Sequence, residues 1–334
     1  MSLSVQKTSN EIKKVAVLTS GGDSPGMNAA IRAVVRNAIF HNLQVIGVKR
    51  GYSGLLNSDF MEMQSHSVSK IISTGGTILK SSRCPEFTTG EGRKVAVENM
   101  KKQEIDGLVV LGGDGSFRGA DLLWKESGFP VVGVPCTIDN DIFGTDFTIG
   151  FDTAVNTAVA AVDKIRDTAD SHNIIFFVEV MGRNSGFIAL NTAISCGAEA
   201  TLIPETPTNI EQLCDYLERG RRKNKTSGIV IVAEGDDEGS AAEIAGKVKT
   251  RLPGYQTRVT TLGHIQRGGS PTSNDRVLAS FLGFEAVNAL LNGKHGVMVG
   301  QIHGRVAYTL LEEASSKRNK IDKTLAEISR ILSL

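Results

Sequence analysis

Apolar strands that each run into a glycine-rich loop and then a helix recur along this chain, and this alternation limits the possible folds most strongly. The first strand covers 14–19, and its loop leads to a helix for which Ser24 is the expected cap and Pro25 the first residue. The segment 107–111 repeats the pattern with the loop GGDGS. Because strands that alternate with helices pair mostly in parallel, the sequence predicts an α/β fold with mostly parallel sheets.

The remaining strands extend this pattern over most of the chain, and a helix at 153–166 follows one of their loops. In open parallel sheets, ligands bind beyond the carboxyl ends of the strands, where the unusual polar residues of this sequence fall. At 334 residues the chain is long enough for two domains, with a boundary near residue 150. A turn at 50–54 and a surface helix from Leu310 are also predicted. The other predicted strands are 43–48, 129–134, 174–180, 228–233 and 258–262.

The loop after the strand at 129–134 is the most polar of these loops. Thr137, Asp139 and Asp141 lie close together there, with Asn140 between the two carboxylates. Adjacent carboxylates at the end of a buried strand repel each other and are costly to desolvate, so they favour a general base or a metal ligand. The alternative is an Asp-rich turn in which the side chains bond to nearby backbone amides, and this stretch alone leaves both interpretations open.

Two double-glycine loops, at 20–23 and 112–116, lie between a strand and a helix. Glycine there allows backbone N–H groups to approach a phosphate, and the helix N-terminus adds partial positive charge. The alternative is a tight turn that binds nothing. Neither loop matches G-x-x-x-x-G-K-[ST] or a G-x-G-x-x-G followed by a ribose-binding carboxylate. An ordinary P-loop NTPase and a simple dinucleotide dehydrogenase are therefore disfavoured.

Arginines in loops among glycine, serine and threonine supply the positive charge, and two of them, Arg258 and Arg267, bracket His264. That spacing favours a fork of donors for a phosphate. His264 has no second histidine or cysteine nearby, so it is not expected to bind a metal. Glycine loops for a polyphosphate, carboxylates for Mg²⁺ and a base, and arginines for a second phosphate together indicate phosphoryl transfer to a small phosphorylated alcohol. The other two arginines of this kind are Arg83 and Arg183.

The composition disfavours several other functions. The formal net charge is +1 and aromatic residues make up 5%, so neither a global field for nucleic acid nor stacking platforms for single strands are expected. No apolar run approaches the ~20 residues of a membrane span, and the four scattered cysteines are typical of free thiols. The N-terminal segment lacks the apolar core of a signal peptide. We therefore expect a cytoplasmic protein with no nucleic-acid or membrane partner.

Specific motifs are spread over almost the whole chain: LTSGGDSPGMNAAIR, GGDGS, TIDNDI-x-GTD-x-TIGFDTA, VEVMGR, AEG and GHIQRGGSP. Together they resemble the 6-phosphofructokinase family. The resemblance implies two Rossmann-like α/β domains with the active site in the cleft between them, and a homotetramer. An ATP-binding larger domain would comprise 1–150 plus about 266–313. A sugar-phosphate-binding smaller domain would comprise 151–265 plus about 314–334.

Carried over position by position, the resemblance implies roles for individual residues. Asp139 would be the general base that takes the proton from the sugar 1-hydroxyl, and Thr137 would position that acceptor. Asp114, with Asp141 close by, would bind Mg²⁺, and Arg183 would face the charge on the transferring phosphoryl group. The implied catalytic residues are Asp139, Thr137, Arg183, Asp141 and Gly21. The implied ATP contacts are Gly21, Arg83, Cys84, Gly113, Asp114, Gly115 and Ser116. The implied contacts with fructose 6-phosphate are Thr137, Ile138, Asp139, Met181, Gly182, Arg183, Glu234, Arg258, His264, Ile265, Gln266 and Arg267.

The effector site of the bacterial family members is matched only in part. Arg32 and Arg36 stand one helical turn apart, which is also typical of an exposed basic face. Ser65 replaces an arginine that the family pattern expects before Val68. The resemblance implies a site for ADP or GDP as effector. Its residues would be Arg32, Arg36, Arg166, Gly197, Glu199, Lys223 and Lys225.

The phosphoryl donor and the strength of substrate binding depend on three further positions. Family members that use pyrophosphate typically carry Asp at the position of Gly115 and Lys at that of Cys136. Gly115 leaves room for a nucleotide, so we expect ATP as the donor. Ile174 replaces an arginine that reaches the sugar phosphate of a neighbouring subunit, so we expect weaker binding of fructose 6-phosphate. The alternatives are a pyrophosphate-dependent enzyme and a non-catalytic paralogue that binds or regulates.

Overall fold

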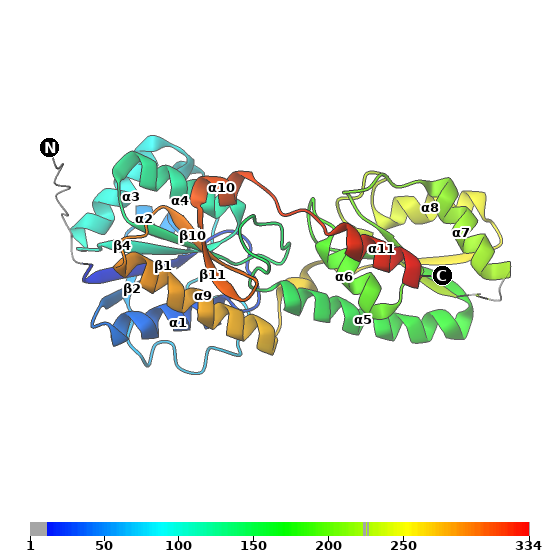
Figure 1. Cartoon of the computed structure of the whole chain (residues 1–334), viewed down its shortest axis with the longest axis horizontal. Coiled ribbons are helices and arrows are strands. Elements are labelled where there is room, and N and C mark those ends of the chain that lie inside the picture. Colours follow the sequence, from blue (N-terminus) through cyan, green and yellow to red (C-terminus); the bar gives the residue numbers. More distant parts are fainter. Residues whose placement is uncertain (1–11, 223–224, 226, 334) are drawn as a thin grey trace.

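The computed structural model describes residues 12–222, 225 and 227–333, which form two α/β bodies with a sheet in each (Figure 1). In the larger body the strand order is β11-β10-β5-β4-β1-β2-β3, and the central pairs are parallel. The antiparallel pairs β2–β3 and β10–β11 lie at its two edges. The predicted α/β class with mostly parallel sheets is confirmed. The strands of this body are β1 (Lys14–Thr19), β2 (Gln44–Val48), β3 (Phe60–Glu62), β4 (Gly107–Gly112), β5 (Val131–Pro135), β10 (Val297–Ile302) and β11 (Arg305–Leu310).

Helices cover both faces of the larger sheet, which is why its central strands are continuous apolar runs. On one face α1 packs closely against α9. Gly283 permits this approach, since a Cβ there would lie only 2.7 Å from the Ala30 carbonyl oxygen. On the other face, an apolar cluster joins Tyr52, Phe117 and Leu311. The helices are α1 (Met27–Phe40), α2 (Tyr52–Leu56), the 3-10 helix η1 (Pro85–Thr88), α3 (Gly90–Lys102), α4 (Asp114–Ser127), α9 (Ser273–Leu291) and α10 (Leu311–Ser316).

The smaller body is built on a parallel sheet with the order β7-β8-β6-β9. Phe177 and Val178, neighbours on β6, belong to different apolar clusters because successive side chains of a strand point to opposite faces. α5 and α6 cover one face, and α7 and α8 cover the other. The elements are α5 (Phe151–His172), β6 (Ile174–Val180), α6 (Phe187–Cys196), β7 (Ala200–Leu202), α7 (Ile210–Arg222), β8 (Gly228–Ala233), α8 (Ala241–Arg251), β9 (Gln256–Thr261) and α11 (Lys323–Leu332).

The chain passes between the two bodies repeatedly (Figure 1). It enters the smaller body with α5 and returns through the 3-10 helix η2 (Gly263–Arg267) to α9. The segment 317–322 then leads from α10, which packs on α4, to α11, which packs on α6. These crossing segments carry several of the residues predicted for the site. No helix in the described part of the chain combines the length and the apolar character needed to cross a membrane.

The strands predicted at 14–19, 174–180 and 228–233 are confirmed to the residue, whereas the predicted cap of the first helix is wrong. α1 begins at Met27 and is preceded by Gly26, which has a φ of 107°. Ser24 is buried, and its Oγ finds no hydrogen-bond partner among the described residues. It packs against Gly150, where a Cβ would lie 2.6 Å from the Ser24 Cβ. Tertiary packing therefore overrides the local capping pattern.

Two other local predictions are also wrong. The predicted turn at 50–54 contains the start of α2, because Tyr52 turns inward and is buried in the core. The single helix predicted from Leu310 is instead the end of β11 followed by two separate helices. The break between them has a simple cause, since α10 packs in the larger body and α11 in the smaller one.

Candidate active site

The two glycine loops lie side by side, because β1 and β4 are parallel neighbours and their carboxyl ends meet at one edge of the sheet. The Ser20 N–H donates to the Leu111 carbonyl at 2.9 Å. A Cβ at Gly112 would lie 2.4 Å from Ser116 Oγ and 2.6 Å from the Ser20 carbonyl oxygen, so the close approach requires glycine. α4 begins at Asp114, directly after Gly113, and its N-terminal N–H groups open onto these loops. This arrangement suits a phosphate.

The acidic loop, 137–141, follows β5 and is held by its own side chains. Asn140 adopts a left-handed backbone conformation with φ 53°, and its Oδ1 accepts from the Thr148 N–H at 2.7 Å. The Thr148 hydroxyl donates to the Thr137 carbonyl at 2.7 Å. Asp139 is buried, and its Oδ1 has no hydrogen-bond partner within the part of the chain that the structure describes. The loop thus presents one buried carboxylate oxygen that is not used in forming the turn.

The carboxylates of this loop are shifted toward protonation. Burial, followed by the nearby charge of Asp141, raises the pKa of Asp139 to about 6, although Arg267 and Arg183 act in the opposite direction. Burial also raises the pKa of Asp141, against the effect of Arg318. A carboxylate with a pKa near neutrality is well matched to the role of a general base.

Two arginines face the carboxylates across the strand ends. Arg183 Nη1 lies 3.6 Å from Asp114 Oδ1. Arg318 Nη2 lies 2.5 Å from Asp114 Oδ2, and Arg318 Nε lies 3.1 Å from Asp141 Oδ2. Arg318 was not among the residues predicted for the site. The available signal was a basic residue in a polar segment near the end of the chain, which no motif singled out.

The oxygen atoms of Asp114 and Asp141 fit the requirements of Mg²⁺. Both carboxylates are partly exposed and are joined by a single guanidinium, so the pair lies where a cation is already favoured. The described residues contain no cluster of three or more histidine, cysteine or acidic side chains that could hold a metal by themselves. One or two carboxylates completed by phosphate oxygens are the usual way in which proteins bind Mg²⁺.

The loop after β6 brings the smaller body into contact with the acidic loop. The Ser185 hydroxyl donates to the Asp139 carbonyl at 3.0 Å. Arg183 has φ 57°, and its N–H donates to Glu234 Oε1 at 2.6 Å. The predicted residues Met181 and Gly182 precede Arg183 in the same loop. Loops from both sheets therefore meet around Asp139.

The residues predicted for the sugar phosphate are only partly brought together. Arg267 lies against the first glycine loop, with its Nη1 3.3 Å from the Asp23 carbonyl and 2.6 Å from where a Gly22 Cβ would stand. Gln266 is buried, whereas His264 and Ile265 are exposed. Arg258 is exposed on β9, the edge strand of the smaller sheet. Arg267 thus lies against the first glycine loop, where its charge acts to lower the pKa of Asp139, whereas Arg258 is exposed.

The segment that carries Arg83 and Cys84 lies along the first glycine loop. The Ser81 hydroxyl donates to the Gly21 carbonyl at 2.5 Å, and the Thr19 hydroxyl donates to the Lys80 carbonyl at 2.9 Å. Arg83 is exposed and Cys84 is half-buried, and burial raises the pKa of the Cys84 thiol. The predicted ATP contacts of this segment and of the two glycine loops therefore occupy one region.

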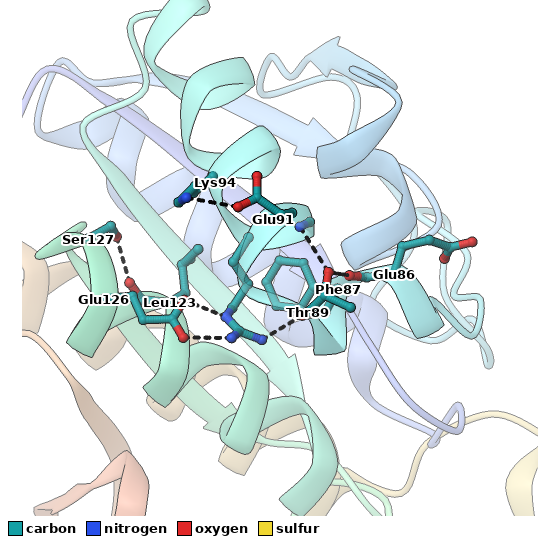
Figure 2. A network of polar contacts seen from close by, with 10 residues as sticks. Glu86, Phe87, Thr89, Glu91, Lys94, Leu123, Glu126 and Ser127 are labelled. Carbon is teal, nitrogen blue, oxygen red and sulfur yellow. Dashed lines mark hydrogen bonds and ion pairs between the residues drawn. The ribbon is translucent and has the colours of Figure 1, made fainter.

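A polar network around the buried Arg93 joins α3 and η1 to α4. Arg93 donates to both carboxylate oxygens of Glu126, at 2.6 and 2.7 Å, and to the Phe87 carbonyl at 2.9 Å. Figure 2 shows the surroundings of this network, with Glu126 and Phe87 labelled. The Phe87 ring stacks on Tyr52 with centroids 3.9 Å apart, and the Tyr52 hydroxyl donates to the Ser116 carbonyl at 2.5 Å. Tyr52, which was not predicted as a site residue, thereby supports the second glycine loop through Ser116.

Replacing Tyr52 with phenylalanine is expected to raise the KM for ATP about three- to tenfold and to lower stability by about 1–2 kcal/mol, because the buried Ser116 carbonyl loses its side-chain donor. Burial raises the pKa of the Tyr52 hydroxyl, so in the wild type it remains a donor. Tyr216→Phe is the matched control, since that hydroxyl also donates to a backbone carbonyl, Ser333, but in the smaller body. Steady-state kinetics with an unchanged KM for ATP in Tyr52→Phe would contradict the expectation.

The residues predicted for an effector fall into two groups. Arg166, Gly197 and Glu199 lie together, with Arg166 Nη2 2.7 Å from the Cys196 carbonyl and Nη1 3.8 Å from Glu199 Oε1. Glu199 and Lys225 also line a cavity of about 1100 Å³ between α7, β7 and α11. Arg32 and Arg36 lie on α1, in the larger body. Lys223 is outside the described residues.

Comparisons with known proteins agree with this picture. The sequence profile of the family described as Phosphofructokinase matches residues 14–290. The chain is 52% identical to the ATP-dependent 6-phosphofructokinase 2 of Bacteroides thetaiotaomicron, over 97% of the chain and 99% of that protein. It is also 52% identical to the ATP-dependent 6-phosphofructokinase 1 of Thermus thermophilus, over 97% of the chain and 100% of that protein.

Solved structures are similar over the whole fold. The crystal structure of Pichia pastoris phosphofructokinase in the T-state matches with a TM-score of 0.86 and 39% identity, over 91% of this chain and 35% of that longer chain. Parallel α/β bodies whose strand ends carry glycine loops, carboxylates and arginines define a class of phosphate-binding proteins. Within that class, the chain belongs to the phosphofructokinase family.

Proposed function

We propose that this protein is an ATP-dependent 6-phosphofructokinase of glycolysis, which transfers the γ-phosphoryl group of ATP to the 1-hydroxyl of fructose 6-phosphate. The products are fructose 1,6-bisphosphate and ADP. The observation that carries the proposal is the buried carboxylate of Asp139, which has a raised pKa and lies where loops of both bodies meet. The names of relatives that are 52% identical over nearly the whole chain support ATP as the co-substrate.

In the proposed reaction, Asp139 accepts the proton of the 1-hydroxyl while that oxygen bonds to the γ-phosphorus. The bond from the γ-phosphorus to the oxygen bridging to the β-phosphorus breaks, and ADP leaves. Thr137 positions the acceptor hydroxyl, and Arg183 faces the charge that develops on the phosphoryl group. The backbone N–H groups at the start of α4 and around Gly21 hold the polyphosphate.

The binding residues carried over from the resemblance are part of the same proposal. The hydrogen bond from Ser81 to the Gly21 carbonyl supports an ATP position near Arg83 and Cys84. The contact of Arg267 with Gly22 and its influence on the pKa of Asp139 support a sugar phosphate next to the acceptor site. Arg258 and His264 are exposed, and that leaves both free to bind an anion.

Mg²⁺ is the proposed cofactor, with Asp114 as its ligand and Asp141 as support. The partly exposed oxygen atoms of this pair suit a hard cation that also needs phosphate ligands. When bound, Mg²⁺ would neutralise charge on the phosphate oxygens.

A donor assay tests the proposed function directly, with ATP expected to exceed pyrophosphate in kcat/KM by at least about a hundredfold, or ~2.7 kcal/mol in the barrier. The structure leaves open space at Gly115, where an added Cβ would meet no atom within 4 Å among the residues described. Cys136 is buried in the core of the larger body, so its side chain is not available to bind the phosphoryl donor. Equal steady-state rates with pyrophosphate would overturn the ATP assignment, and no turnover with either donor would favour a non-catalytic paralogue.

The remaining parts of the proposal concern assembly and location. The separate apolar clusters of the two sheets support domains of 1–150 plus about 266–313 and of 151–265 plus about 314–334. The effector residues on α1 and those near Glu199 belong to different bodies. A homotetramer with an ADP or GDP site between chains would bring both groups to one ligand. We place the protein in the cytoplasm, where its proposed substrates are found.

A further inference from the structure

The guanidinium of Arg318 joins the two carboxylates of the proposed Mg²⁺ site, and the reaction above gives this arginine no role. Its Nη2 pairs with Asp114 at 2.5 Å and its Nε pairs with Asp141 at 3.1 Å. A planar guanidinium offers several donors in a fixed geometry, so a single arginine can serve two carboxylates at once. Arg318 therefore neutralises both members of the pair.

The backbone around Arg318 is fixed to the acidic loop. Arg318 forms an antiparallel bridge with Ile142, which is fully buried. The Asn319 N–H donates to the Asp141 carbonyl at 3.0 Å, and Asn319 Nδ2 donates to the Thr145 carbonyl at 2.8 Å. These bonds hold the base of the side chain in place. The contact with the carboxylates is therefore built into the fold of the crossing segment 317–322.

The guanidinium end can leave without disturbing the core. The Arg318 side chain is 41% exposed, whereas Asp114 and Asp141 are 22% and 18% exposed. Without a cation, Asp114 and Asp141 would repel each other, and Asp141 would add to the negative charge near Asp139. Arg183 also lies 3.6 Å from Asp114, whereas Arg318 contacts both carboxylates, at 2.5 and 3.1 Å. The pair therefore favours a positive charge beside it.

We propose that Arg318 is the resident counter-cation of the Asp114–Asp141 pair and that a divalent cation entering the site displaces its side chain. The proposal rests on the proposed function, in which this pair is the metal site. The arginine and the metal compete for the same oxygen atoms, so Arg318 weakens binding of the free metal. Metal affinity is then set in part by a residue that is not a ligand.

Direct binding of Mn²⁺ to the full-length enzyme without nucleotide, measured by electron paramagnetic resonance, tests the proposal. Arg318→Met removes the charged end and keeps an unbranched apolar side chain about as long as the arginine stem, and we expect it to bind Mn²⁺ on the order of tenfold more tightly than the wild type. Arg318→Lys keeps the charge but loses the fork of donors that serves both carboxylates, so its Mn²⁺ affinity is expected to lie between those of the wild type and Arg318→Met. If Arg318→Met does not fold, Arg318→Gln takes its place. Asp114→Asn in each background is the control.

The outcomes separate this inference from the metal assignment. Tighter Mn²⁺ binding in Arg318→Met that is lost on adding Asp114→Asn supports the displacement. Unchanged or weaker binding in Arg318→Met, while Asp114→Asn still abolishes it, overturns the role of Arg318 and leaves the metal site standing. Mn²⁺ binding that does not respond to Asp114→Asn in either background overturns both.

Discussion

Replacement of Asp139 by asparagine is expected to lower kcat by about 10²- to 10⁴-fold, because the amide cannot accept the proton of the attacking hydroxyl. Fructose 6-phosphate should still bind, with a Kd within about threefold of the wild type. Asp139 Oδ1 makes no hydrogen bond with any residue described in the structure, so the change removes little that holds the loop together. The substitution also removes a negative charge that burial and the nearby Asp141 destabilise. Turnover and calorimetric binding of the sugar phosphate are the two measurements.

The pH dependence provides a control for this variant. The pKa of Asp139 is raised to about 6, so the base is increasingly protonated, and kcat/KM of the wild type falls, as pH drops below that value. The phosphate monoester of the substrate also titrates near pH 6, so it contributes to the same fall of kcat/KM at low pH. In Asp139→Asn, the part of this pH dependence that comes from Asp139 is lost. Any fall of kcat/KM at low pH that persists in the variant comes from the substrate. An unchanged profile, or a fall in kcat of less than about tenfold, would exclude Asp139 as the base.

The limits of the sequence analysis follow from the distance along the chain over which each contact is made. Each glycine loop, and the acidic loop, is a single short stretch of sequence that follows a strand. The order of strand, loop and helix therefore predicted where each loop lies and that the loops are close together in a parallel sheet. Arg318 contacts a residue 204 positions away, and Tyr52 contacts one 64 positions away. No local pattern marks such partners. Only the final packing of the crossing segment and of the core decides them.

The misplaced elements have the same origin. Ser24 and Pro25 form a good local start for a helix, yet the helix begins later because Ser24 packs against Gly150. The helix predicted from Leu310 is divided because its two halves pack on different bodies. Ile174, which replaces an expected arginine, is buried at the start of β6, and its effect on substrate binding stays a prediction.

Asp275 joins the start of α9 to the start of α5, and it illustrates how a distant residue supports the site. Its side chain is 1% exposed. Oδ1 accepts from the Gly150 N–H at 2.8 Å, and Oδ2 accepts from the Thr153 N–H at 2.8 Å and from the Thr153 hydroxyl at 2.5 Å. An anion at this position satisfies the first N–H groups of α5, the helix that follows the acidic loop.

Replacement of Asp275 by alanine is therefore expected to cost about 3 kcal/mol of stability, because two buried N–H groups and a hydroxyl lose their acceptor at once. Asp275→Asn keeps the shape and one acceptor oxygen, so it should lose about half as much. Asn274→Ala is the matched control: this exposed neighbour on α9 makes one exposed hydrogen bond to Asp152, at 3.3 Å, and the change should stay within about 0.5 kcal/mol. Urea unfolding at one fixed protein concentration measures all three variants. If Asp275→Ala unfolds at the same urea concentration as Asn274→Ala, the hydrogen bonds that Asp275 accepts from Gly150 and Thr153 do not stabilise the fold.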